Sequence, residues 1–213
     1  MSCFPPSSTS EFVAIDFETT GYENGNVNEP WQLGIAVVRG CEIVETREFF
    51  FDVEGAPARA HESDALGTLM SSFESWAPSL LDRRLVAHNI ACEKTILTRV
   101  APLTKWGPWV DTMRLAKARY PKLPSYALGD LCERFGCVPN LPGRTWHDGL
   151  YDAVACAYLA LFLSSSKPTR PSGSLGPTTR PTVTSPVGRA AWARAAATFQ
   201  TFQTSQTFQT FPP

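Results

Sequence analysis

The chain lacks the features of a membrane protein and of a secreted protein. Its longest apolar stretches, such as residues 154–163, fall well short of the roughly 20 apolar residues that a membrane-spanning helix needs. Residues 1–10 contain no lysine or arginine and no apolar segment, which is unlike a secretory signal. The sequence therefore predicts no membrane partner and a cytoplasmic location.

The cysteines lack the spacing of a structural zinc site. The chain has 6 cysteines, but no two of them form a C-x-x-C pair and no histidine follows at zinc-finger spacing. We expect reduced thiols, as is usual inside cells.

The chain also lacks an excess of positive charge, and its charges are unevenly distributed. A formal net charge of -1 excludes a protein that holds nucleic acid by bulk positive charge. All 20 acids lie at or before Asp152, whereas 5 of the 19 basic residues follow Leu163. Residues 1–163 therefore carry about six net negative charges and the remainder five positive ones. We predict a folded domain over residues 11–163 and a tail over residues 164–213.

The tail has the composition of a disordered segment. Proline, serine and threonine dominate its first half, and a Thr-Phe-Gln unit repeats near its end. Such a segment cannot bury enough apolar surface to offset the entropy lost on ordering. We therefore predict a disordered tail.

Within residues 11–163, the apolar pattern predicts three strands followed by helices that alternate with short strands. Ser125 and Gly136 are expected to start and stop one of these helices. This order implies a mixed sheet with helices packed on it, an α/β domain. The predicted strands are 12–17, 31–38, 41–53, 85–87 and 109–110, and the predicted helices are 71–81, 93–100, 111–120, 126–135 and 148–163.

Two carboxylates stand at the end of the first apolar strand. Asp16 and Glu18 are two residues apart, so on a strand their side chains point to the same face. The strand before them is nearly all apolar, which favours a central position where paired acids are costly unless a cation neutralises them. A divalent metal ion is the natural partner.

Two further segments place polar residues at the ends of secondary-structure elements. His147 opens the last predicted helix and Asp152 lies about one turn into it, so both can reach one site. Asp148 is better explained as a helix-capping carboxylate than as a ligand. Glu93 follows a short apolar strand at the start of a helix, where a helix-start carboxylate is an equally good interpretation.

In this order, the segments DFETTG, VAHNIACEKTIL and HDGLYDA resemble the three motifs of the DnaQ-like DEDDh exonucleases, which have a ribonuclease-H-like fold. The resemblance covers residues 11–163, and the stretch from Asp111-Thr112 through SYALGDL resembles the segment that connects the second and third motifs. It implies a 3′–5′ exonuclease that releases nucleoside 5′-monophosphates from DNA or RNA ends.

The resemblance also implies roles for eight residues. Asp16, Glu18 and Asp152 would hold two Mg²⁺ or Mn²⁺ ions, with Asp16 shared between them, and Glu93 would support the second ion. His147 would accept the proton of the attacking water, since imidazole is basic yet unprotonated near neutral pH. Thr19, Thr20 and Asn89 would contact the terminal nucleotide.

The chain departs from the family at Glu93, where the family usually has aspartate. Hard cations accept either carboxylate, so we expect the activity to be retained, although a catalytically weak module that binds nucleic acid is the alternative. A second alternative is a proofreading or repair subunit whose tail docks onto a polymerase or another protein partner. A basic strip could track phosphates, or could equally be a solvated helix face. It comprises Arg114, Lys117, Arg119 and Lys122.

Overall fold

The computed structural model describes residues 11–21, 28–58 and 65–165. The predicted tail lies outside these residues, apart from its first two positions, which belong to the last helix. The domain boundary and the disordered tail therefore stay predictions. Within the described residues, no helix is both long enough and apolar enough to cross a membrane.

A mixed five-stranded sheet forms the centre of the described structure, in the order β3-β2-β1-β4-β5. The first three strands pair antiparallel, whereas β1, β4 and β5 run parallel to one another. The predicted mixed sheet is confirmed. The strands are β1 (Glu11–Thr19), β2 (Pro30–Arg39), β3 (Glu42–Phe50), β4 (Leu85–Ala87) and β5 (Trp109–Asp111).

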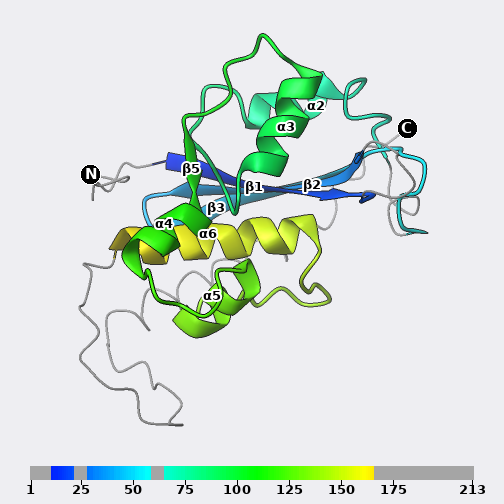
Figure 1. The fold of residues 1–213 in the computed structure, drawn as a ribbon. Coiled ribbons are helices and arrows are strands. Elements are labelled where there is room, and N and C mark those ends of the chain that lie inside the picture. Colours follow the sequence, from blue (N-terminus) through cyan, green and yellow to red (C-terminus); the bar gives the residue numbers. More distant parts are fainter. Residues whose placement is uncertain (1–10, 22–27, 59–64, 166–213) are drawn as a thin grey trace, which may run out of the picture. The chain divides into compact units, whose positions relative to one another are not determined.

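Helices cover both faces of this sheet (Figure 1). One face carries α2 (Phe73–Trp76), the 3-10 helix η1 (Ala77–Ser79) and α3 (Ala91–Val100). The other face carries α6 (Gly149–Ser165), with α4 (Thr112–Arg119) and α5 (Leu128–Phe135) packed against α6.

Alternation along β1 decides which helices its side chains meet. Val13, Ile15 and Phe17 belong to the apolar core under α2 and α3, together with Trp76 and Leu97. Residues at the intervening positions point to the opposite face, which α6 covers. Asp16 and Glu18 occupy these intervening positions, so β1 directs both carboxylates toward the α6 side of the sheet.

Core spacing in the sequence predicts one buried face for α6, formed by Leu150, Val154, Tyr158, Leu161 and Phe162, but the helix is buried on more than one side. Leu150 and Val154 are buried as expected, whereas Tyr158, Leu161 and Phe162 remain partly exposed. The helix lies between the sheet and α5, where the Phe162 ring stacks on the Phe135 ring at 4.6 Å between centroids. Burial of both sides explains why the sequence shows little of the usual amphipathic pattern.

Two local predictions are wrong. A continuous helix over 71–81 is replaced by α2 and η1, because Pro78 in the first turn of η1 cannot donate the hydrogen bond that would continue α2. Ser125 is not the N-cap of α5, which is Ala127; the Ser125 hydroxyl accepts from Ala127 N–H instead. The predicted stop at Gly136 is confirmed, with a left-handed φ of 69°.

Candidate active site

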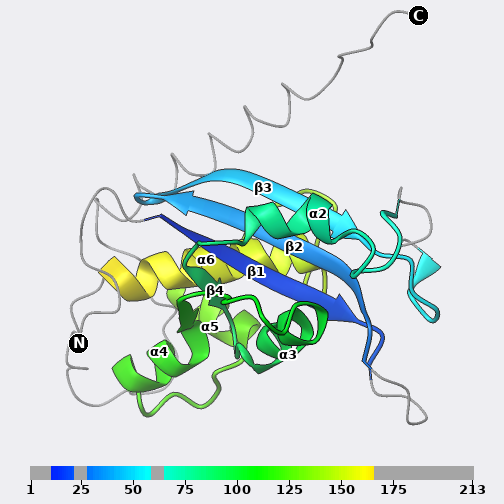
Figure 2. The same ribbon diagram turned by 90° about the horizontal axis from the view of Figure 1, so that it is seen from above.

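The three parallel strands end at one edge of the sheet, and acidic residues gather there. Glu18 lies at the carboxyl end of β1, Asp111 ends β5, and Glu93 is the third residue of α3, which follows β4. Figure 2 shows α3 beside the arrowhead of β1. The carboxyl ends of parallel strands are the usual place for ligand sites in α/β sheets, because the loops that follow the strands converge there.

A close contact between two glycines brings the start of α6 to this edge. A Cβ atom on Gly34 of β2 would lie only 2.0 Å from the backbone oxygen of Gly149, so no larger residue fits at Gly34 without displacing the helix. The Gly149 N–H donates a 3.1 Å hydrogen bond to Gln32 Oε1. The first turn of α6, which carries Asp152, is thereby held against β1 and β2.

Side chains from β1 and from the start of α6 converge at this point. One potential ligand atom from each of Glu18, His147 and Asp152 lies within 4.8 Å of the other two. His147 is exposed and has a left-handed φ of 66°, and its backbone N–H donates a 3.1 Å hydrogen bond to Asp152 Oδ2. The strained backbone at His147 presents its imidazole beside two carboxylates.

Asp16 lies in a strongly acidic environment. Burial raises the pKa of Asp16 well above its usual value, and the negative charges of Glu93, Asp152, Glu18 and Asp148 raise it further. Every neighbour that shifts this pKa is another acid, so the surrounding negative charges disfavour ionisation of Asp16. Asp16 and Glu93 therefore join the cluster electrostatically, although they are not among the three residues with the closest ligand atoms.

Two carboxylates in the cluster have raised pKa values and an oxygen without a partner. Burial raises the pKa of Glu93 to about 7 and that of Asp152 to about 6. Glu93 Oε2 and Asp152 Oδ1 are buried and have no hydrogen-bond partner within the described part of the chain. Buried oxygens of this kind are costly unless they bind a proton or a cation. This set of hard oxygen ligands thus fits a divalent metal ion, with the imidazole of His147 beside it.

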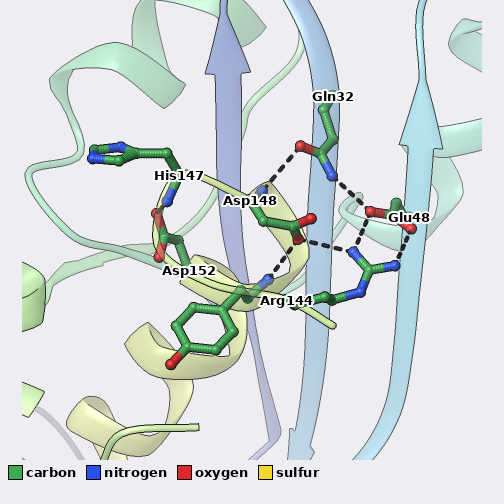
Figure 3. Close-up of polar contacts among 8 residues, drawn as sticks. Gln32, Glu48, Arg144, His147, Asp148 and Asp152 are labelled. Atoms are coloured by element: carbon green, nitrogen blue, oxygen red, sulfur yellow. Dashed lines mark hydrogen bonds and ion pairs between the residues drawn. The ribbon is translucent and has the colours of Figure 1, made fainter. Parts of the chain in front are cut away.

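The other acid of the third motif has a different role. Asp148 precedes α6, and its Oδ1 accepts a 3.1 Å hydrogen bond from Tyr151 N–H, as a helix cap does. Arg144 Nη1 donates to the same oxygen at 2.8 Å. The interpretation of Asp148 as a capping residue is confirmed. Figure 3 shows Asp148 directed toward Arg144 and Gln32, away from His147 and Asp152.

The three predicted substrate-contacting residues lie at or beside the same edge. Thr19 ends β1, and the Thr20 hydroxyl accepts a 3.2 Å hydrogen bond from Glu29 N–H. Asn89 follows β4 with a left-handed φ of 63°, is exposed, and donates from its backbone N–H to Asp111 Oδ1 at 3.2 Å. Their contact with a nucleotide stays a prediction.

The neighbouring His88 is a structural residue. Its Nε2 lies 2.8 Å from the Tyr126 backbone oxygen and its Nδ1 lies 2.9 Å from the Thr112 hydroxyl. Burial lowers the pKa of this imidazole, which favours the neutral ring. A neutral ring that donates from Nε2 and accepts at Nδ1 satisfies both contacts and ties the end of β4 to α4.

Sequence reasoning missed Asp111, Gln32, Glu48 and Arg144. Asp111 Oδ1 accepts from Met113 N–H and Arg114 N–H at the start of α4, so an Asp-Thr pair before a helical pattern was a signal of a capping residue. The other three come from distant parts of the chain, and the contact between Arg144 and Glu48 spans 96 residues. No local spacing signals such a contact.

The chain is similar in sequence to PolC-type DNA polymerases III of bacteria. It is 28% identical over 167 residues to the PolC-type DNA polymerase III of Halalkalibacterium halodurans, a match that covers 72% of this chain and 11% of the relative. The corresponding protein of Bacillus subtilis is 26% identical over 168 residues, with 70% and 11% covered. The chain thus spans about a tenth of the length of these curated relatives. No family model matches the chain.

Solved exonuclease structures share the fold. Exonuclease X in complex with 5′ overhanging duplex DNA superimposes with a TM-score of 0.54 at 23% identity, covering 71% of this chain and 90% of that one. A 3′-exonuclease in a structure of histone mRNA stem-loop recognition gives 0.56 at 19% identity, covering 74% and 65%. Escherichia coli exonuclease I bound to an oligonucleotide gives 0.52 at 15% identity, covering 73% and 40%.

The structural matches establish the ribonuclease-H-like fold, and the PolC matches add similarity in sequence. The three motifs of the chain lie on β1, at the start of α3 and at the start of α6. The motifs, the shared fold and the similarity in sequence agree with the resemblance of the chain to the DnaQ-like 3′–5′ exonucleases.

Proposed function

We propose that the chain is a metal-dependent 3′–5′ exonuclease that hydrolyses phosphodiester bonds at nucleic-acid 3′ ends and releases nucleoside 5′-monophosphates. The observation that carries this proposal is the convergence of four carboxylates and one imidazole at the carboxyl edge of the parallel strands. The negative charges of these carboxylates act on one another, as the raised pKa of Asp16 indicates. Buried acids that repel one another destabilise the metal-free fold, so a bound cation best explains their presence at one site.

Asp16, Glu18 and Asp152 would hold Mg²⁺ or Mn²⁺, and Glu93 would supply a further carboxylate. When bound, divalent ions at such a site make a water more acidic and stabilise negative charge on the phosphate. Glu93 reaches the site with one methylene more than aspartate would. Its unpartnered Oε2 and its effect on the pKa of Asp16 support a role in the site rather than a helix-start carboxylate alone.

The imidazole of His147 would act as the general base. It accepts a proton from the water whose oxygen attacks the terminal phosphorus, while the bond from phosphorus to the 3′-oxygen of the preceding nucleotide breaks. The leaving 3′-oxygen takes a proton from solvent. The hydrogen bond from His147 N–H to Asp152 fixes the backbone at this residue, which limits the positions that the exposed ring can adopt.

The substrate class is a nucleic acid with a 3′ end, DNA or RNA. One structural neighbour is described with duplex DNA and another with a histone mRNA stem-loop, so the fold itself favours neither. The predicted basic strip is only partly available for phosphates. Lys117 lies 5.5 Å from the centroid of the Tyr126 ring, and Arg114 Nε lies 3.7 Å from Asp111, whereas the Arg114 side chain is 83% exposed.

A polymerase is the protein partner that the PolC similarity favours. In those relatives the matching region is a small part of a much longer chain. A partner that docks onto this chain would place the nuclease near a growing 3′ end. A pull-down with the full chain and with a chain lacking residues 167–213 tests whether the tail makes this contact.

A product assay tests the proposed activity directly. The full chain is incubated with 5′-labelled single-stranded DNA and RNA, with Mg²⁺ or Mn²⁺ and with EDTA. We expect stepwise shortening from the 3′ end and release of nucleoside 5′-monophosphates with metal, and neither with EDTA. The matched control is Asp16→Asn, which keeps the side-chain shape but removes the charge. Shortening that persists in EDTA contradicts the metal dependence, and a wild-type chain without activity favours the catalytically weak module.

A further inference from the structure

A second polar cluster lies beside the candidate active site, and none of the residues proposed for catalysis belongs to it. Arg144 Nη1 and Nη2 donate to the two carboxylate oxygens of Glu48 at 2.5 and 2.7 Å. Nη1 also donates to Asp148 Oδ1 at 2.8 Å. Gln32 Nε2 donates to Glu48 Oε1 at 2.6 Å. Figure 3 shows these four side chains between β2, β3 and the start of α6, and we call them the Arg144 cluster.

The Arg144 cluster connects two strands to the segment that carries the candidate base. Gln32 belongs to β2 and Glu48 to β3, whereas Arg144 and Asp148 flank His147 in the chain. Gln32 Oε1 accepts from Gly149 N–H, and Asp148 Oδ1 accepts from Tyr151 N–H. Each end of the cluster therefore terminates on a backbone N–H of the first turn of α6.

The cluster is sufficiently buried for its geometry to be restrictive. The exposed fractions of the side chains are 29% for Arg144, 17% for Glu48 and 9% for Asp148, and Gln32 is fully buried. A planar guanidinium that binds one carboxylate with two nitrogens has a fixed orientation, which a lysine cannot reproduce. Removing one partner of such a network leaves buried groups unpaired, so the segment must rearrange.

We propose that Arg144 is a positioning residue that holds His147 and Asp152 in place by fastening the segment from 144 to the first turn of α6 onto β2 and β3. This inference rests on the proposed function for its effect on catalysis, but not for its effect on structure. Arg144 acts on the position of the base, and the substrate is bound elsewhere. Its loss therefore lowers kcat more than it raises KM.

The test combines kinetics with hydrogen–deuterium exchange on the full chain. In Arg144→Ala, kcat on a short 3′-labelled oligonucleotide is expected to fall about 100-fold, since a shift of about 1 Å in a catalytic group has an effect of this size. KM should change little. In Arg144→Lys, which keeps the charge but loses the two-nitrogen contact, the fall should be smaller, about 10-fold. Exchange at the amides of His147, Gly149 and Tyr151 should be faster in Arg144→Ala than in the wild type.

A matched control removes an arginine from the same sheet far from the site. Arg39 at the end of β2 pairs with Glu11 at 3.0 Å, and its side chain is 62% exposed. Arg39→Ala should leave kcat and the exchange at these three amides unchanged. Glu48→Gln, which keeps the side-chain shape but not the charge, should repeat the Arg144→Ala pattern more weakly. It also carries the test if Arg144→Ala does not fold.

The two readouts separate the inference from the proposed function. Faster exchange in the Arg144 and Glu48 variants supports the positioning role even if the wild-type chain has no nuclease activity, in which case only the proposed function fails. In an active chain, unchanged kcat, an effect confined to KM, or unchanged exchange at these amides overturns the positioning role.

Discussion

Two groups of acidic side chains lie on either side of the start of α6, and they are stabilised in opposite ways. Glu48 and Asp148 both pair with Arg144. Asp16, Glu93 and Asp152 instead have pKa values raised by burial, and every neighbour that shifts the pKa of Asp16 is acidic. The first group is complete within the protein, whereas the second is suited to an added cation.

This difference distinguishes acids that have a structural role from acids that we propose to bind a cation. A buried carboxylate that is paired and hydrogen-bonded contributes to a defined local structure, and breaking the pair is costly. Buried carboxylates that repel one another destabilise the metal-free fold, and proteins tolerate that cost mainly at functional sites. Acids a few residues apart, such as Asp148 and Asp152, can therefore differ in role because their partners differ.

Replacing one acid from each group should give opposite results, and this is the largest effect we expect. Asp16→Asn should lower turnover by about 10⁴-fold, as loss of a central catalytic group does, while making the metal-free protein more stable. Asp148→Asn should lower the free energy of unfolding by about 1–2 kcal/mol, because Arg144 and Tyr151 N–H lose a charged acceptor. Steady-state kinetics and urea unfolding measure the two effects. Equal stability changes in both variants would remove the distinction.

Replacing His147, which lies beside the second group, tests whether it acts as the base or as a metal ligand. His147→Ala should lower turnover by roughly 10² to 10⁴, the range for a positioned proton acceptor, with little change in Mn²⁺ affinity. Kinetics and calorimetry on the same protein provide the comparison. Mn²⁺ affinity that falls together with turnover would make His147 a ligand instead.

Replacing Glu93 tests what glutamate does at the position where the DnaQ-like exonucleases usually have aspartate. Glu93→Ala should lower both Mn²⁺ affinity and turnover, by about 10- to 100-fold. Glu93→Asp restores the usual residue and should keep the activity, or raise it if the surrounding side chains accommodate the shorter acid. If Glu93→Ala changes neither quantity, Glu93 is a helix-start carboxylate only.

The stability of the metal-free protein should fall as the pH rises. The pKa of Glu93 is about 7 and that of Asp152 about 6 in the fold, above their values in the unfolded chain. Between about pH 4 and pH 7 the folded state therefore binds more protons than the unfolded chain. The stability that these protons contribute is lost as the pH rises through this range. Glu93→Gln should reduce the decline between about pH 5 and pH 8 by about 2 kcal/mol. Urea unfolding at a series of pH values in EDTA measures this slope; a slope that Glu93→Gln leaves unchanged would contradict the raised pKa.

The sequence predicted most of the sheet because strand patterns and turn residues are local. Runs such as residues 12–17 and 31–38 specify strands by composition, and Gly136 specifies a helix end by its permitted backbone angles. The prediction of one helix over 71–81 was wrong because Pro78 interrupts the backbone hydrogen bonds that a continuous helix needs. Helix α6 is packed on two sides, so its partners could not be inferred from its own periodicity.

The candidate site was predictable only as far as its residues lie in compact motifs. Asp16 and Glu18 share one strand, and His147 and Asp152 share one helix start, so local geometry brings each pair together. The contribution of Glu48 could not be predicted, because it depends on a contact with Arg144 across 96 residues. The close approach of Gly34 to Gly149 likewise depends on how α6 crosses the sheet.

Calorimetric titration of the metal-free full chain with Mn²⁺ tests most directly whether the second group of acids is a cation site. The titration is carried out near pH 6.5 in two buffers that differ in ionisation enthalpy, so that released protons are counted. We predict binding with release of on the order of one proton, because carboxyls with raised pKa values must ionise to bind the metal. Binding should be lost in Asp16→Asn and retained in Arg39→Ala. No binding by the wild-type chain, or equal binding by Asp16→Asn, would contradict the account.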